Sequence, residues 1–383
     1  MTEQMNHKQS WNIITLFLVM IFGLTIATFV KPDTDFSESE NRSLASRPKF
    51  SFASLFSGEY TKEYEDYLTD QFVLRDQWIG VKTQAERLCF RQEINDIYFA
   101  KDDYLIEKHT GSFVSDQAKA NISYLGAFAE QCADTYGLQH LTVMIVPNAV
   151  DILREKLPAF AAPYDEEVYL QQIREALPEE SWFDASSVLR SHKEEPIYYR
   201  TDHHWKTLGA FYVFAAWAGE QGLSEVKTED YTVATVTDTF EGTIASKVGT
   251  KVKADTIETY ENKEPVTYDL TYNQTNDVRS SVYQASALER KDKYAYFYGG
   301  NYGLIEASTD AHTGRKLLVI KDSYAHCFVP FTYSLFDEVD MVDLRYFNQS
   351  LSEYMKKGDY TDILFLYNAS GFAEDSSLIR LTT

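Results

Sequence analysis

The sequence predicts an α/β fold in which helices cover both faces of a mostly parallel sheet. Two short runs near the C-terminus, 316–320 and 363–367, have the apolar pattern of strands that are buried on both faces, and 338–342 is a third short strand of the buried type. A fourth run of this kind, 141–147, lies earlier in the chain. Helical patterns separate these runs, and strands that alternate with helices are typical of a sheet with two covered faces.

Helices are expected between the strands of this sheet. Each expected helix has apolar residues at helical spacing. Gly137 suits the position just after the expected helix 117–136, because glycine commonly follows the end of a helix. Pro178 ends the expected helix 169–177, because proline cannot continue a helix. The expected helices span residues 117–136, 169–177 and 207–220.

Residues 13–30 form an apolar run without a charged side chain. The run is about long enough to cross a bilayer core as a helix. It exceeds the apolar core of a signal peptide, and Thr25-Ile26-Ala27 is only a weak cleavage sequence. We therefore predict a single-pass, uncleaved signal anchor in the cell membrane. Residues 1–12 would be a short cytoplasmic tail, and the rest of the chain would lie outside the cytoplasm.

Composition divides the chain beyond the apolar run. Residues 31–50 are polar and predict a juxtamembrane linker. Residues 51–383 have ordinary globular composition and predict one extracytoplasmic domain. Within it, 52–99 has the apolar spacing of two helices, broken near 70–72. The stretch 227–296 alternates polar and apolar residues, which predicts an antiparallel, β-rich insertion.

Charge and cysteine content exclude several kinds of partner and site. The net charge of −22 argues against nucleic acid, because phosphate binding requires clustered Lys and Arg. It also disfavours a broad electrostatic contact with anionic lipid. Cys89, Cys132 and Cys327 are odd in number and lack C-x-x-C spacing, so they indicate neither a disulfide framework nor a metal site. We expect three buried thiols, and one Cys89–Cys132 bridge remains open.

The stretch Asp202-His203-His204-Trp205 is the first candidate for chemistry. A carboxylate beside an imidazole fixes the tautomer of the ring and stabilises its protonated form. One alternative is a capping Asp with solvent-facing histidines. A metal site is another, but adjacent histidines point in different directions and a third ligand is not evident. We therefore expect no metal and no cofactor.

The second candidate is Ser323, in the stretch that follows the apolar run 316–320. A nucleophile at the C-terminal end of such a strand lies where α/β sheets bind ligands. The start of a following helix would supply backbone N–H groups for an oxyanion. An isolated Asp-Ser pair is more often a helix cap. The presence of an Asp-x-His stretch in the same chain favours the nucleophile.

Two glycines precede this strand, in Tyr298-Gly299-Gly300-Asn301. Paired glycines let the backbone approach a ligand closely, and an Asn amide can donate to an oxyanion. We expect Gly299, Gly300 and Asn301 to bind the oxyanion or the substrate. A plain turn is the alternative.

Four further residues are candidates for secondary roles. Arg345 follows another apolar run and could clamp a substrate or Asp322, or form a structural ion pair. Tyr324, beside the serine, is a further substrate-binding candidate. His203 and His326 compete with His204 as the general base.

These stretches resemble the motifs of a known family. Asp202-His203-His204-Trp205 and Lys321-Asp322-Ser323-Tyr324 are similar to the defining motifs of the DHHW protein family. Glu40-Asn41-Arg42 and Asp70-Gln71-Phe72, with Arg75, resemble its N-terminal region. The chain is more distantly similar to the SGNH-like proteins of bacterial alginate O-acetylation. Those proteins carry an Asp-x-His-Trp motif upstream of a Ser-Tyr motif.

The resemblance implies an SGNH-like three-layer α/β/α sandwich with a Ser-His-Asp triad. Asp202 would be the acid, His204 the base and Ser323 the nucleophile. It implies an extracytoplasmic O-acyltransferase that moves an acetyl group through a serine acyl-enzyme to a cell-surface polysaccharide. A polytopic membrane O-acyltransferase would be the partner that donates the acyl group. Lys321 departs from the pattern, because the family usually has Gly before Asp-Ser.

Two other functions fit the same residues. A carbohydrate esterase would use the same triad with water as the acceptor. A non-catalytic glycan-binding or assembly protein would keep the fold without depending on Ser323.

Overall fold

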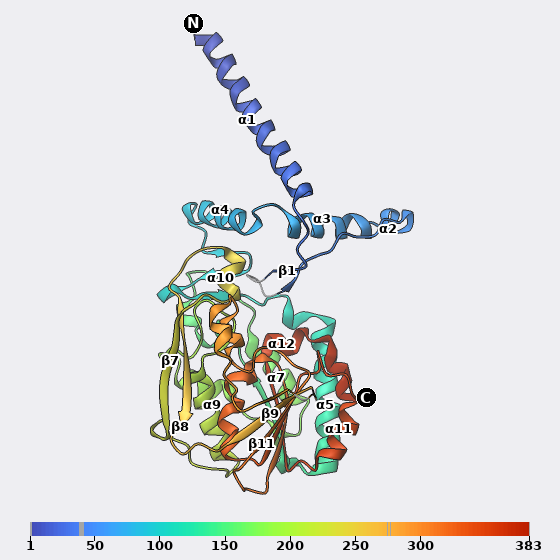
Figure 1. Cartoon of the computed structure of the whole chain (residues 1–383), viewed down its shortest axis with the longest axis vertical. Coiled ribbons are helices and arrows are strands. Elements are labelled where there is room, and N and C mark those ends of the chain that lie inside the picture. Colours follow the sequence, from blue (N-terminus) through green and yellow to red (C-terminus); the bar gives the residue numbers. More distant parts are fainter. Residues whose placement is uncertain (1, 38–41, 274, 276, 383) are drawn as a thin grey trace. The chain divides into compact units, whose positions relative to one another are not determined.

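A computed structural model describes residues 2–37, 42–273, 275 and 277–382 of the chain (Figure 1). The chain forms two compact units. The first comprises Met1–Phe90 and Ser246–Thr250, and the second comprises Arg91–Ala245 and Lys251–Thr383. The predicted boundaries of the linker and the extracytoplasmic domain stay predictions.

The first unit contains the long apolar helix and three shorter helices. His7–Val30, within α1, is long and apolar enough to cross a membrane, as the sequence predicted. Ser51 caps α2 through a hydrogen bond to Ser54 N, and Gly58 (φ 82°) separates α2 from α3. The two helices expected over 52–99 are therefore three. The elements are α1 (Thr2–Val30), β1 (Phe36–Ser37), β2 (Arg42–Ser43), α2 (Phe52–Ser57), α3 (Glu59–Gln71) and α4 (Arg75–Leu88).

The two N-terminal stretches that carry the family resemblance meet in an ion pair. Arg42 binds both carboxylate oxygens of Asp70, at 2.9 and 2.6 Å. This hydrogen-bonded pairing lowers the pKa of Asp70 below its ordinary value. Asp70 lies at the end of α3, where the sequence predicted the helix break. Glu40 and Asn41 lie outside the described residues.

A seven-stranded sheet forms the centre of the second unit, in the order β10-β9-β11-β13-β12-β14-β6. The four predicted strands are its parallel half, because β12 pairs in parallel with β13 and β14, and β14 pairs in parallel with β6. The other strands are antiparallel and extend one edge. The strands are β6 (Leu141–Val146), β9 (Tyr268–Tyr272), β10 (Val278–Arg279), β11 (Leu304–Thr309), β12 (Lys316–Lys321), β13 (Glu338–Val342) and β14 (Asp362–Asn368).

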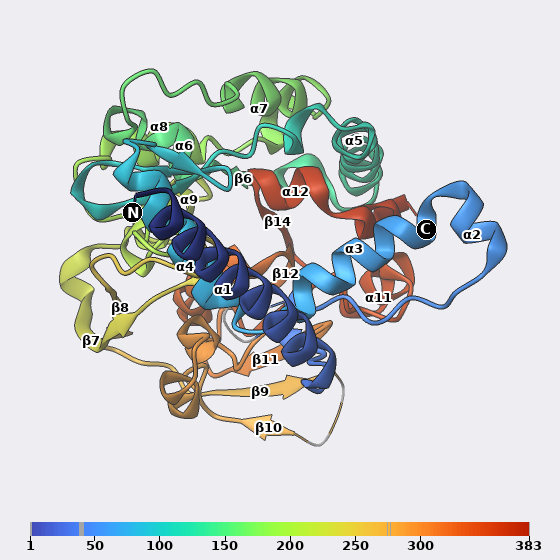
Figure 2. The same ribbon diagram turned by 90° about the horizontal axis from the view of Figure 1, so that it is seen from above.

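Two apolar cores lie on the two faces of this sheet. Along β12, Leu317 and Val319 pack into one core, and Leu318 and Ile320 pack into the other. This alternation buries both faces of the strand and gives the three-layer α/β/α arrangement that was predicted. Figure 2 shows α5 and α11 on one side of the strands, and α9 with the β7–β8 hairpin on the other.

The covering helices agree with the sequence pattern to within a few residues. Gly137 follows α5 with φ 90°, a conformation that favours glycine. The 227–296 stretch contains the antiparallel β7–β8 pair and also β9 and β10 of the large sheet. These elements are α5 (Asp116–Tyr136), α6 (Ala149–Ile152), α7 (Glu166–Glu175), α8 (Ala185–Ser191), α9 (Thr207–Glu220), α10 (Thr243–Val248), α11 (Leu351–Gly358), α12 (Ala369–Glu374), β3 (Glu93–Ile94), β4 (Ile97–Phe99), β5 (Leu105–Glu107), β7 (Tyr231–Phe240) and β8 (Asp255–Asn262).

Short 3-10 helices make up most of the remaining regular structure. They are η1 (Lys101–Asp103), η2 (Ser112–Val114), η3 (Leu138–His140), η4 (Arg154–Lys156), η5 (Glu179–Ser181), η6 (Thr228–Asp230), η7 (Ala285–Glu289), η8 (Lys293–Tyr296), η9 (Ser323–Cys327), η10 (Val329–Ser334) and η11 (Ser376–Thr382). The helix that we expected after Ser323 is therefore one short 3-10 turn, η9.

The three cysteines are free thiols. Cys132 and Cys327 are buried, and burial raises the pKa of each to about 12. Cys89 is exposed, so the expectation of three buried thiols was wrong at this position, and it forms no bridge with Cys132. The reason is local: Cys89 follows the last turn of α4, between the exposed Leu88 and Phe90.

Candidate active site

Ser323 lies at the carboxyl end of β12, in the parallel half of the sheet. Asp322 fixes this turn, because its Oδ1 accepts from Tyr324 N at 2.9 Å and its Oδ2 accepts from Asn368 N at 2.8 Å. Burial raises the pKa of the Asp322 carboxyl, and the Arg345 charge offsets part of that rise. Asp322 therefore ties the end of β12 to the end of β14.

His204 connects the serine to Asp202. Its Nε2 lies 2.7 Å from Ser323 Oγ, and its Nδ1 lies 2.5 Å from Asp202 Oδ1. A carboxylate can only accept, so Nδ1 carries the ring proton and Nε2 is left to accept from the hydroxyl. The three side chains converge as the sequence predicted, within the distance expected for proton transfer.

Thr243, the first residue of α10, holds the second carboxylate oxygen of Asp202. Thr243 N and Thr243 Oγ1 donate to Asp202 Oδ2 at 3.0 and 3.2 Å. Burial alone would raise the pKa of Asp202. The adjacent His203 and His204, with the hydrogen bonds from His204 and Thr243, lower it well below the ordinary value instead. Asp202 is therefore held in its ionised form near neutral pH.

Aromatic side chains fix the imidazole and the serine turn. The Tyr294 ring stacks on His204 at 3.8 Å between centroids, and its hydroxyl donates to Ser323 O at 3.0 Å. Trp205 Nε1 donates to Tyr324 O at 2.8 Å. The Tyr324 hydroxyl donates to His203 O. Sequence reasoning missed Tyr294 and Thr243, because neither belongs to a motif. Trp205 could have been found from the sequence, because it belongs to the Asp-His-His-Trp stretch.

The two competing histidines are held elsewhere. His203 is half-buried, and its Nδ1 lies 3.1 Å from Thr243 Oγ1. His326 is buried, with Nε2 2.8 Å from Lys321 Nζ. Burial and the neighbouring Lys321 charge lower the pKa of His326 well below its ordinary value. In the part of the chain that the structure describes, neither ring forms a hydrogen bond with Ser323.

Lys321 takes part in a buried charge cluster below the serine. Its Nζ lies 3.4 Å from Asp343 Oδ2, and both side chains are fully buried. Burial lowers the pKa of Lys321, although the Asp343 carboxylate opposes this. Arg345 binds Asp343 through Nε at 2.8 Å and through a terminal nitrogen at 2.6 Å. The described side-chain hydrogen bonds of Arg345 therefore all go to Asp343. This is the structural ion pair that the sequence analysis gave as one of two alternatives for Arg345.

Comparison with known proteins identifies the family. The DHHW protein model matches residues 136–342, more than half of the chain. This chain belongs to the DHHW protein family.

Solved structures share its fold. A DHHW family protein from Eubacterium siraeum aligns with a TM-score of 0.59 and 24% identity, over 76% of this chain and 96% of that one. Bacillus cereus PatB1 aligns with a TM-score of 0.59 and 19% identity, over 72% and 97%. PatB1 with a sulfonyl adduct aligns at 0.58 and 20%, over 73% and 98%. A search of the curated proteins finds no match.

The glycine pair of this DHHW protein lies in a turn after Tyr298. Gly299 and Gly300 have φ of 86° and 127°, which only glycine adopts readily. A Cβ on Gly299 would meet Arg279 at 3.2 Å, and Asn301 is exposed. The described hydrogen bonds do not join this turn to Ser323. Its role at an oxyanion stays a prediction.

The Asp-His-His cluster of this DHHW protein has the composition of a metal site. The potential ligand atoms of Asp202, His203 and His204 lie within 4.8 Å of one another. The donor set does not fit an ion, because both Asp202 oxygens already accept hydrogen bonds and His204 Nε2 meets Ser323. We assign no metal to it.

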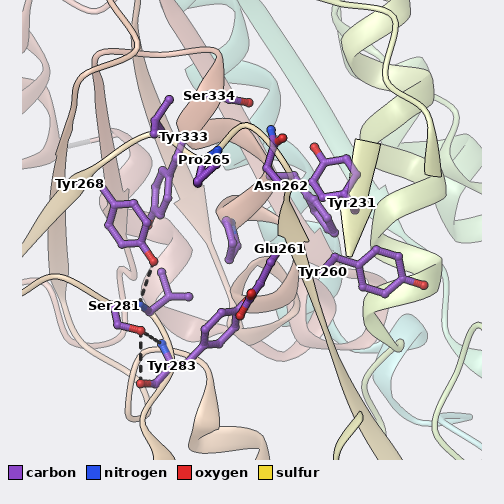
Figure 3. Close-up of a pocket in the computed structure, with 14 residues that line it drawn as sticks. Tyr231, Tyr260, Glu261, Asn262, Pro265, Tyr268, Ser281, Tyr283, Tyr333 and Ser334 are labelled. Carbon is purple, nitrogen blue, oxygen red and sulfur yellow. Dashed lines mark hydrogen bonds between the residues drawn. The ribbon is translucent and has the colours of Figure 1, made fainter. Parts of the chain in front are cut away.

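A cavity of about 290 Å³ lies apart from these residues, between the end of β8, the segment after β10 and η10. Figure 3 shows Tyr268 and Tyr333 on one side of it and Tyr231 and Tyr260 on the other. The predicted site residues are not part of its lining. The serine of this DHHW protein therefore lies outside its aromatic cavity.

Proposed function

We propose that this DHHW protein is an extracytoplasmic serine O-acyltransferase. It would move an acetyl group through Ser323 to a hydroxyl of a cell-surface polysaccharide. The observation that carries this proposal is the 2.7 Å contact between His204 Nε2 and Ser323 Oγ, together with the 2.5 Å contact between His204 and Asp202. A serine hydroxyl is a weak nucleophile by itself, and this arrangement activates it.

The first half-reaction forms the acyl-enzyme. Ser323 Oγ attacks the carbonyl carbon of the acyl donor while His204 Nε2 takes the hydroxyl proton. The carbon–oxygen bond to the donor then breaks, and His204 returns the proton to the leaving group. Asp202 stabilises the imidazolium between these two proton transfers and does not itself become protonated.

The second half-reaction runs the same steps in reverse. An acceptor hydroxyl gives its proton to His204 as its oxygen attacks the acyl carbon. The bond to Ser323 Oγ breaks, and the serine regains a proton from His204. Transfer to a glycan and hydrolysis by water differ only in which hydroxyl enters at this stage.

The acetyl group and the glycan acceptor rest on the resemblance of the two motifs to those of the alginate O-acetylation proteins. Outside the membrane there is no acetyl-CoA, so we propose a polytopic membrane O-acyltransferase as the donor partner. The N-terminal helix would anchor the chain beside that partner, since His7–Val30 has the length and apolar composition of a span.

The proposal is tested by the mass of the detergent-solubilised full chain after exposure to p-nitrophenyl acetate. We expect one acetyl adduct, mapped by peptide digestion to Ser323. A sulfonyl fluoride should label the same residue, since a structure of PatB1 carries a sulfonyl adduct. An adduct that survives in Ser323→Ala would overturn the serine mechanism and favour a binding protein.

A second measurement separates transfer from hydrolysis. The acetylated protein is isolated and mixed with soluble oligosaccharides, and the acetyl group is followed. Faster loss of the adduct with appearance of an O-acetylated sugar supports transfer. Loss at the same rate with or without the sugar supports the esterase alternative.

A further inference from the structure

The large apolar side chains exposed beyond α1 are concentrated in α2, α4 and their flanks. In α2, 72% of Phe52 and 86% of Phe56 is exposed. In and beside α4, the exposed fractions are 57% for Leu74, 58% for Val81 and 81% for Leu88. Large apolar side chains exposed close together mark an interaction surface on a folded protein.

Helix α2 has the character of a lipid-facing segment. Its six residues, Phe52–Ser57, carry no charge, and none of them is buried. A helix this short is not stable in water by itself. Its Phe52 ring contacts only the exposed Phe50 among the described ring pairs, at 5.4 Å between centroids, so its apolar side chains remain largely uncovered. An apolar environment beside it would supply the missing stabilisation.

Helix α4 exposes its apolar face, whereas a surface helix of a soluble protein buries its apolar face. Positions along an α-helix turn by about 100° each, which brings a set of exposed apolar residues onto one face. The buried Thr83 is on the opposite face, where a Cβ on Gly80 would lie 2.7 Å from Gly249 O. A soluble helix packs its apolar face and exposes its polar face. The exposed apolar face comprises Leu74, Trp78, Val81, Ala85 and Leu88.

Hydrogen bonds fasten the junction of α3 and α4 to the end of α1. Val73 N donates to Thr28 Oγ1 at 3.3 Å, and Thr28 is buried in the last turn of α1. Gln71 exchanges hydrogen bonds of 2.9 Å with the backbone of Thr34, just beyond α1. Figure 1 shows α2, α3 and α4 running crosswise to α1 from this end. If α1 spans a bilayer, the junction lies at the bilayer surface.

We propose that α2 and α4 lie in the interfacial layer of the bilayer that α1 spans, with their apolar side chains among the lipids. This inference rests on the proposed anchoring by α1. Lipid is the occupant that fits, because the hydrogen bond from Val73 N to Thr28 Oγ1 joins the segment before α4 directly to the end of the membrane helix. Phe and Trp side chains suit this layer. The contact is apolar, so the net charge of −22 does not oppose it.

The test compares probe environments in the full chain, reconstituted into phosphatidylcholine vesicles. The exposed Cys89 is first replaced, as Cys89→Ser, while the buried Cys132 and Cys327 do not react. An environment-sensitive fluorophore is then attached through Phe56→Cys or Val81→Cys. Matched controls are Glu63→Cys on α3 and Asp76→Cys on the polar face of α4, both exposed.

We expect the probes at 56 and 81 to emit at shorter wavelength and to be quenched several-fold more strongly by nitroxide-labelled lipid than those at 63 and 76. Equal, water-like emission at all four positions, in protein that still floats with the vesicles, would overturn the inference and leave the anchoring intact. Protein that does not float would overturn both. Probes shielded in native membranes but not quenched by lipid would assign the surface to a protein partner instead.

Discussion

At the residue scale, the site depends on where one proton lies on His204. Asp202 stays ionised because His203, His204 and Thr243 together lower its pKa against the effect of burial. An ionised carboxylate holds the proton on Nδ1, so Nε2 can accept from Ser323. Under the proposed mechanism, Asp202 would act on Ser323 only through His204.

Replacing Asp202 tests this division of roles. We expect Asp202→Asn to slow acylation by p-nitrophenyl acetate about 10⁴-fold, because an amide favours the wrong imidazole tautomer. Ser323→Ala should abolish the adduct altogether, since it removes the atom that carries the acyl group. The measurement is the burst of p-nitrophenol together with the protein mass. An adduct on Lys321 or Tyr324 that is unchanged in Ser323→Ala would contradict the assignment.

The neighbouring histidines provide a matched pair. We expect His204→Ala to lose nearly all acylation, because the serine loses its proton acceptor. His203→Ala should keep most of it, because the His203 ring contacts Thr243 rather than the serine. Burst kinetics measured on the two variants side by side decide the point. Equal losses in both would show that the base is not His204 alone.

At the element scale, the loop from β7 to α10 determines how Asp202 is placed. Gly242 N donates to Thr201 Oγ1 at 3.0 Å, and the next residue, Thr243, binds the carboxylate. A Cβ on Gly242 would lie 2.4 Å from Asp202 Oδ2, a distance that no real pair of atoms tolerates. The absence of a side chain at position 242 is therefore part of the site.

Gly242→Ala should displace the Asp202 carboxylate without unfolding the protein. A misplacement of about 1 Å in a catalytic group costs on the order of 10²-fold in rate, so we expect at least that loss in acylation. The matched control is Gly219→Ala in α9, where a new Cβ would meet nothing within 4 Å. Acylation rates are compared after circular dichroism has shown that the two variants are folded to the same extent. Full activity in Gly242→Ala would show that the loop does not position Asp202.

A buried carboxylate in β13 makes stability depend on pH. Burial raises the pKa of Asp340 to about 6, although Tyr360 and Tyr354 donate hydrogen bonds to it. In the unfolded chain the pKa of an Asp carboxyl is about 4. Between these two values the folded protein binds more protons than the unfolded chain. The free energy of unfolding therefore falls as the pH rises through this window.

Asp340→Asn should remove that dependence. From about pH 4 to pH 7, we expect wild type to lose on the order of 2–3 kcal/mol of unfolding free energy relative to the variant. Thermal unfolding of both proteins across this range, in the same detergent, measures the difference. If the unfolding free energies of the two proteins changed with pH in parallel, Asp340 would titrate in the folded protein as it does in the unfolded chain.

The elements that could be predicted from the sequence are those whose signal is local. β12, β14 and β6 are nearly continuous apolar runs, because both of their faces are buried. The antiparallel edge was not predicted strand by strand, since a segment such as β9 mixes polar and apolar residues. The motifs located Asp202, His204 and Ser323. Tyr294 reaches His204 only through the tertiary fold, across ninety positions of sequence.

At the scale of the whole molecule, the apolar core and the apolar surface belong to different parts of the chain. Both cores consist of residues between Tyr98 and Leu381, on the two faces of the large sheet. The exposed apolar faces of α2 and α4 belong to the first unit. The second unit can therefore bury its apolar side chains without the first, whereas the helices of the first unit need an external apolar environment.

Fragments that begin at different residues separate these two properties. The sequence predicted an extracytoplasmic domain over 51–383. We expect fragment 91–383 to be monomeric without detergent and to unfold cooperatively, because it contains both cores. Fragment 52–383 retains α2 and α4, so it should float with phosphatidylcholine vesicles or aggregate without them.

Light scattering, flotation and near-ultraviolet circular dichroism measure these outcomes. As a control, Phe52→Ser, Phe56→Ser, Val81→Ser and Leu88→Ser combined in fragment 52–383 should restore solubility, since all four side chains are exposed and none supports a core. If fragment 91–383 itself aggregated unless detergent were present, the second unit would carry a membrane surface of its own. If fragment 52–383 ignored vesicles and stayed monomeric, α2 and α4 would not be lipid-binding helices.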